Sequence, residues 1–229
     1  MIPFKDNVPT RIRPVVTVGL ILLNCAVFFL QQSLPEDLYV ETVYVLGAIP
    51  VRVLHLDSWF SASIHNPGLS LVTSMFMHGG WLHLGGNMLY LWIFGNNVED
   101  SMGHFRFVIF YLLCGFAAAA AQVLSAPDST VPMIGASGAV SGVLGAYLIL
   151  HPFARVHTLI ILIIFIQIIE LPAILVLSVW LLLQIMNSLA APAGAAGVAW
   201  HAHIGGFVVG FLLIRFFQNR SLRRRTFYR

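Results

Sequence analysis

Charged side chains are scarce in this chain. Lys, Arg, Asp and Glu make up 9% of its 229 residues, whereas an average soluble domain has about 25%. So little charge cannot cover the surface of a soluble protein, and the hydrophobic 59% of the residues gathers in long blocks. The composition therefore excludes a soluble globular enzyme and predicts a protein embedded in a lipid bilayer.

Cysteine is also rare. The two cysteines, Cys25 and Cys114, both lie inside apolar blocks, where we interpret them as small packing residues. Two such cysteines exclude a disulfide framework and a cysteine-type metal site. We expect no cofactor and no metal.

Six apolar segments are candidates for membrane helices. Their approximate limits are Val15–Leu30, Trp81–Phe94, Phe105–Leu124, Ser137–Leu150, His157–Leu189 and Ala202–Phe217. The connection from Gln31 to Gly80 is expected to contain short interfacial helices. We find no second domain, so residues 1–229 are predicted to form one all-α membrane domain, a bundle of six helices with a short fourth helix.

Positive charge predicts the topology. The first apolar segment lacks a signal-peptide cleavage site, so we interpret it as a retained span. With a cytoplasmic N-terminus, only Arg52 of the 12 Lys and Arg residues lies outside. Residues 1–14 and the basic tail 218–229 are then cytoplasmic. We interpret Arg223–Arg225 as an anchor to anionic lipid headgroups and not as a nucleic-acid site.

Ser137 stands in the small-residue run Gly135-Ala136-Ser137-Gly138. Glycines with this spacing commonly serve only helix packing. However, the helix predicted to follow has about 14 residues, or roughly 21 Å, while the hydrocarbon core is about 30 Å thick. Ser137 would then lie at a helix N-terminus below the membrane surface, where irregular backbone requires protein or a watery cavity beside it.

His203 opens the last apolar segment. His203, Gly206 and Gly210 share one helix face, and the glycines allow close approach to the Ser137 helix. A Ser–His pair is the minimum for an activated nucleophile. We interpret the neighbouring His201 as an interfacial residue.

A further polar cluster consists of His78, His83 and Asn87, the last two on one face of the second span. Donors of this kind suit an oxyanion hole. Two alternatives are interhelical hydrogen bonding and a zinc site on His78 and His83. The zinc site is weakened because no acidic residue lies nearby.

The predicted topology places these groups at one depth. The second, fourth and sixth spans all enter from the outer side, and Asn87, Ser137 and His203 each lie near the start of one of them. We therefore expect a site that opens toward the extracytoplasmic side.

Glu170 is the one acidic residue that this interpretation places within a span, next to Pro172. We expect a local break in the fifth helix, with Glu170 satisfied by its neighbours. His203 then has no acidic partner, so the site is predicted to be a dyad. A mobile fifth helix that acts as a gate is a further hypothesis.

The order His-x-x-x-Asn, Gly-Ala-Ser-Gly and Ala-His-Ile-Gly-Gly on alternate spans resembles the rhomboid intramembrane serine proteases. The resemblance runs from about Val15 to Phe217 and implies Ser137 as nucleophile and His203 as base. His83, Asn87 and the Ser137 N–H would bind the oxyanion, supported by His78, Gly135, Gly138 and Gly206. The implied substrates are single-pass transmembrane proteins, and the first loop and fifth helix would govern their entry.

The chain departs from the family pattern at two places. Some members have a Trp-Arg pair where this chain has Leu69 and Ser70, and a Tyr that stacks on the base where it has Ser141. Neither change removes a catalytic group. A non-catalytic chaperone or scaffold on the same fold, or a small transporter, is the alternative function. The short loops favour the cell (plasma or inner) membrane.

Overall fold

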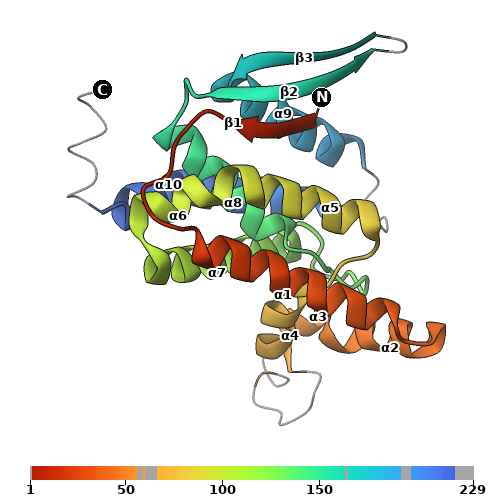
Figure 1. Ribbon diagram of the computed structural model, residues 1–229. Coiled ribbons are helices and arrows are strands. Elements are labelled where there is room, and N and C mark those ends of the chain that lie inside the picture. The colour runs from red at the N-terminus through yellow and green to blue at the C-terminus, as the bar shows by residue number, and fades with distance from the viewer. Residues whose placement is uncertain (1, 56–58, 60–65, 163–164, 192–196, 220–229) are drawn as a thin grey trace.

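Helices make up most of the computed structural model, which describes residues 2–55, 59, 66–162, 165–191 and 197–219. The long helices form a bundle (Figure 1). They are α1 (Val15–Gln32), α5 (Trp81–Tyr90), α6 (Asn96–Met102), α7 (His104–Ser125), α8 (Ser137–Leu150), α9 (Ala173–Ala190) and α10 (Trp200–Phe217).

Four helices within the described residues, α1, α7, α9 and α10, are long and apolar enough to cross a membrane. Helix α8 is shorter, with 14 residues. A π-helical turn, η3 (Leu91–Gly95), joins α5 to α6, so one helical segment runs from Trp81 to Met102. The second segment was thus predicted to end too early, because its last turns are polar.

The described part of the connection between α1 and α5 contains short helices, as expected. They are α2 (Glu36–Leu46), α3 (Pro50–Leu54), α4 (Pro67–Thr73) and the 3₁₀ turn η2 (Ser74–Phe76). Helix α4 begins where Asn66 accepts hydrogen bonds from the N–H groups of Gly68 and Leu69, while Pro67 occupies the first turn.

A three-stranded antiparallel sheet contradicts the all-α prediction. Its strands are β1 (Ile2–Asp6), β2 (Arg155–Leu162) and β3 (Phe165–Pro172), in the order β1-β2-β3. The predicted span His157–Leu189 is therefore wrong in its first half, and only α9 is helical. A run rich in Ile favours strands, and hydropathy alone does not separate a short apolar strand from a helix.

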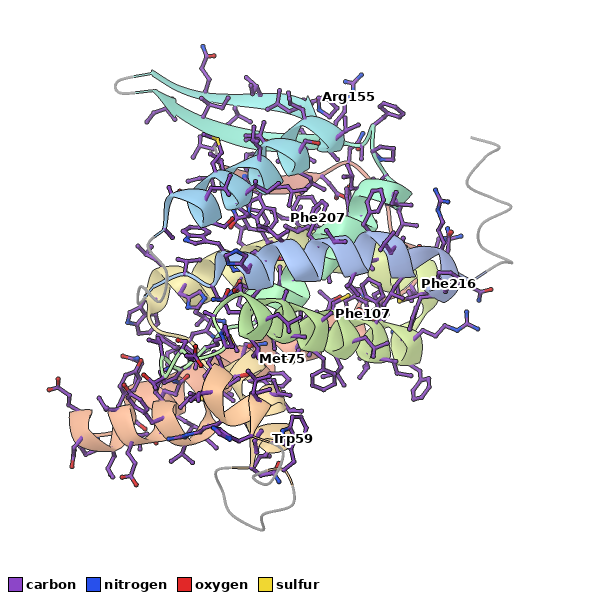
Figure 2. The ribbon with its side chains drawn as sticks, turned by 180° about the vertical axis from the view of Figure 1, so that it is seen from behind. Trp59, Met75, Phe107, Arg155, Phe207 and Phe216 are labelled. Carbon is purple, nitrogen blue, oxygen red and sulfur yellow. The ribbon has the colours of Figure 1, made fainter. Side chains whose placement is uncertain are left out.

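The sheet also corrects the account of Glu170 and Pro172. Glu170 lies in β3, where its carboxylate pairs with Arg155 at 3.1 Å, so it is satisfied locally as expected but not within a helix. Pro172 does not kink a helix, since it directly precedes the first residue of α9. Figure 2 shows α9 between the sheet and α10.

Acidic side chains do occur in the long helical segment 81–102, contrary to prediction. Glu99 is fully buried and accepts hydrogen bonds from Val16 N, Thr17 N and Thr17 Oγ at 2.6–3.0 Å. These are the unpaired donors at the start of α1, where the helix dipole favours a negative charge. Asp100 similarly binds the backbone and guanidinium of Arg11. Glu99 thus ties α1 to α6, and Asp100 ties the segment just before α1 to α6.

Helices α8 and α10 approach each other more closely than any side chain would permit. A methyl group at Gly206 would lie 2.1 Å from the Gly138 carbonyl oxygen, and one at Gly210 would lie 2.0 Å from the Gly142 carbonyl oxygen. Cys114 packs against Gly142 from α7 and is fully buried, which agrees with its interpretation as a packing residue. The predicted approach of these two helices is confirmed.

One sequence-based prediction concerns residues that the structure does not describe. The basic tail from Arg220 onward, including Arg223–Arg225, lies outside the described residues. The prediction that it anchors the chain to lipid headgroups therefore stays a prediction.

We expect Gly210→Ala to destabilise the bundle by about 1–3 kcal/mol, because the new methyl group meets backbone that cannot yield. Gly19→Ala in α1 is the matched control, since nothing lies within 4 Å of the added methyl group there. Equilibrium unfolding in detergent, followed by circular dichroism, measures the difference. Equal stability of the two variants would contradict the proposed backbone contact.

Candidate active site

A cavity of about 980 Å³ opens among α5, α8, α9 and α10. Ser137, His203, His83 and Asn87, the four residues proposed to carry the reaction, all line it. They come from three helices that are far apart in the sequence, so the bundle brings the sequence motifs together in one place.

Ser137 is the first residue of α8 and is half-buried. The N–H groups of a first helical turn have no partner within the helix, and the helix dipole gives that end a partial positive charge. The backbone N–H of Ser137 therefore lies at a helix end where a negative charge would be stabilised. The side chain lies at the cavity wall, directly before the fully packed body of α8.

Gly135 shapes the loop that leads into Ser137. Its φ of +131° is a conformation that other residues rarely adopt, and a methyl group there would lie 2.7 Å from His83 Cε1 and 3.6 Å from Ser137 Oγ. The Gly135 N–H donates to the Ser74 carbonyl at 2.8 Å, which fixes the loop to η2. Gly135 thus lets the backbone pass between the imidazole of His83 and the hydroxyl of Ser137.

His203 lies in the first turn of α10, one turn before Gly206. The close contact of Gly206 with Gly138 sets the separation of the two helices beside the cavity. Among the residues that the structure describes, no hydrogen bond joins Ser137 Oγ to His203. Hydrogen bonds between reacting groups are often long before substrate binds. The observation that counts here is that Ser137 and His203 line the same cavity.

Two donors lie opposite Ser137 on α5. The Asn87 side chain is 7% exposed, and its buried Nδ2 has no partner among the residues described. The Gly79 N–H donates to His83 Nδ1 at 3.4 Å. A neutral ring that accepts at Nδ1 carries its proton on Nε2, the nitrogen next to Gly135. Both side chains can therefore offer an N–H toward the cavity.

His78 supports this wall from behind. It is fully buried, and its ring lies edge-on to that of His83, with ring centroids 5.1 Å apart. Its backbone N–H donates to Gln31 Oε1 at 3.1 Å. No cluster of three His, Cys, Asp or Glu that could hold a metal is found in the described part of the chain. The described residues therefore provide no third ligand for the alternative of a zinc site on His78 and His83.

Residues of α9 complete the surroundings of His203, and sequence reasoning missed them. Gln184 Oε1 lies 2.8 Å from His203 Nδ1, and the Trp180 ring lies beside the imidazole, with centroids 6.0 Å apart. A polar residue inside an apolar helix was the available signal for Gln184. Glu170, in contrast, does not line the cavity.

The departures from the family pattern have local explanations in the structure. Ser141 has no ring to stack on His203, and its hydroxyl instead donates to the Ser137 carbonyl oxygen at 2.6 Å. Leu69 and Ser70 lie in α4, where Ser70 is buried and bonds to the Pro67 carbonyl oxygen.

Comparisons with known proteins agree on one family. Residues 66–220 match the family model of the Rhomboid domain. The chain is 32% identical over 136 residues to Rhomboid protease GluP of Bacillus subtilis, covering 59% of this chain and 24% of that protein. It is 29% identical over 220 residues to Rhomboid-like protein 11, chloroplastic, of Arabidopsis thaliana, covering 92% and 68%.

A third relative is Rhomboid protease AarA of Providencia stuartii, 28% identical over 226 residues, with 86% of this chain and 70% of that protein covered. The chain thus spans only about a quarter of GluP, although it spans more than two thirds of the other two. The family model of the Rhomboid domain matches more than half of the chain, and these relatives are named as rhomboid proteins. The chain therefore belongs to the rhomboid family.

Proposed function

We propose that this chain is an intramembrane serine endopeptidase that cleaves single-pass transmembrane proteins within or beside their membrane span. One observation carries the proposal. A serine at a helix N-terminus, a histidine and the side-chain donors of His83 and Asn87 line one cavity of a largely apolar bundle, and Asn87 Nδ2 has no partner among the described residues. The names of the relatives GluP and AarA, both rhomboid proteases, support the same reaction class.

The proposed reaction is acyl transfer. His203 takes the proton of Ser137, whose oxygen attacks the scissile carbonyl carbon of the substrate. The Ser137 N–H, His83 and Asn87 then stabilise the oxyanion. His203 gives its proton to the leaving amine, and a water molecule activated by His203 hydrolyses the acyl-enzyme.

The proposed topology has six spans with both termini in the cytoplasm. Helix α8 is short and buried along most of its length, so that it crosses only with help from its neighbours, while the segment from Trp81 to Met102 crosses as one helix. The positive-inside rule then places the amino ends of α5, α8 and α10 on the outer side. The cavity opens there, in the plasma or inner membrane.

Two alternatives of other classes make different predictions. A non-catalytic rhomboid-like scaffold would not need a serine and a histidine at one cavity. A transporter would need charged groups along a path through the bundle, whereas Glu99 is engaged at the start of α1 and Asp100 by Arg11 just before it. Both alternatives predict that Ser137→Ala leaves function intact.

Wild-type protein in liposomes is expected to cleave a single-pass transmembrane reporter, and both Ser137→Ala and His203→Ala are expected to abolish cleavage. The reason is that each removes one half of the activated nucleophile. Ser33→Ala and His157→Ala, outside the cavity, are the matched controls. Cleavage that survives Ser137→Ala would refute the assignment of the nucleophile.

Asn87→Ala is expected to lower kcat by a factor of about 10²–10³, because a lost oxyanion donor costs roughly 3 kcal/mol. Asn187→Ala, an exposed residue of α9, should leave kcat unchanged. Initial rates of reporter cleavage measure both. Turnover of Asn87→Ala close to that of the wild type would remove Asn87 from the oxyanion hole.

A further inference from the structure

Helix α9 presents two residues to His203 from one face. Trp180 and Gln184 are four residues apart, so they are neighbours on the helix surface. Gln184 Oε1 lies 2.8 Å from His203 Nδ1, and the Trp180 ring is tilted by 35° against the imidazole at a centroid distance of 6.0 Å. Gln184 is at 7% exposure the one polar residue among the four that α9 buries, the others being Ala173, Val176 and Leu177.

A second hydrogen bond fixes which way the Gln184 amide points. Its Nε2 donates to the Trp180 carbonyl oxygen at 3.2 Å. A flipped amide would place two acceptor oxygens against each other, so Oε1 must face His203. Because Oε1 only accepts, Nδ1 of a neutral His203 must carry the proton. Nε2 is then the free base.

We propose that Gln184, with Trp180, is a positioning residue that holds His203 in the tautomer able to accept a proton from Ser137. This inference rests on the proposed function, because it assigns His203 the role of base. The sequence predicted a Ser–His dyad in which no third residue orients the histidine. In this proposal Gln184 of α9 orients His203. Neither Gln184 nor Trp180 contacts the reacting atoms, so neither is a catalytic residue.

The arrangement couples the base to the position of α9. Trp180 also stacks on Phe207 of α10 at 6.0 Å, and Trp200 meets the His203 ring edge-on at 6.1 Å. His203 therefore lies among side chains of both helices, but its only hydrogen-bond acceptor among the described residues comes from α9. A displacement of α9 would release the base from that acceptor.

The direct test is ¹⁵N NMR of histidine-labelled protein in lipid nanodiscs, with His203 assigned by the signal missing in His203→Asn. The wild type should show a protonated Nδ1 and a bare Nε2. In Gln184→Leu both tautomers should be populated, whereas Gln167→Leu, the same change at an exposed site of β3, should resemble the wild type. A wild-type proton on Nε2, or an unchanged tautomer in Gln184→Leu, would overturn the inference.

Kinetics provide the second readout. Gln184→Leu should lower kcat about tenfold with little change in KM, the size expected for one hydrogen bond. Gln184→Glu should restore activity and move the acid limb of the pH–rate profile to higher pH, because a carboxylate favours the imidazolium form. A role in folding alone would leave that limb in place, which would contradict the inference.

The two readouts separate this inference from the proposed function. The NMR measurement needs no turnover, so it decides the tautomer even for a protein without protease activity. Inactivity together with the expected tautomer would refute the proposed function alone. Activity together with the wrong tautomer would refute the role of Gln184 alone.

Discussion

The contact between the backbones of α8 and α10 is the constraint on which the candidate site depends. Inside a bilayer, apolar side chains gain little by leaving lipid, so helices associate through close packing of small residues. Gly138 and Gly206 allow one backbone to touch the other, and Gly142 and Gly210 repeat the contact farther along. Ser137 directly precedes this seam on α8, and His203 lies one turn before it on α10. Their proximity therefore follows from the packing itself.

Helix α7 packs against this pair through small apolar residues, whereas polar interactions fix other parts of the fold. Buried Glu99 accepts the free N–H groups at the start of α1, and Gly135 ties the loop before Ser137 to η2. Helix α9 buries only four of its residues, yet it supplies the acceptor for His203. The proposed site thus combines a close helix–helix seam, beside which Ser137 and His203 lie, with a helix that buries few of its residues and supplies the acceptor for His203.

The sequence could predict the parts of the molecule that repeat with helical spacing. Glycines at intervals of three and four predicted the seam, and the spacing of His83 and Asn87 predicted their common face. The sheet was beyond reach, because the run of Ile and Phe before Pro172 is as apolar as a membrane helix. It becomes strand β3 by pairing with β2, and β2 pairs on its other side with β1, which is far away in the sequence. Gln184 was missed for a different reason. Its polarity within an apolar run was visible in the sequence, but its partner His203 is identified only when α9 is placed against α10.

The central claim is that Ser137 is an activated nucleophile within the membrane domain. Labelling of the purified protein in liposomes with a fluorophosphonate probe, followed by peptide mass spectrometry, tests it without knowledge of the substrate. We expect the phosphonyl group on Ser137, and its loss in His203→Ala, because the hydroxyl needs a base to react. A folded protein that is labelled elsewhere, or labelled on Ser137 equally well without His203, would contradict the account.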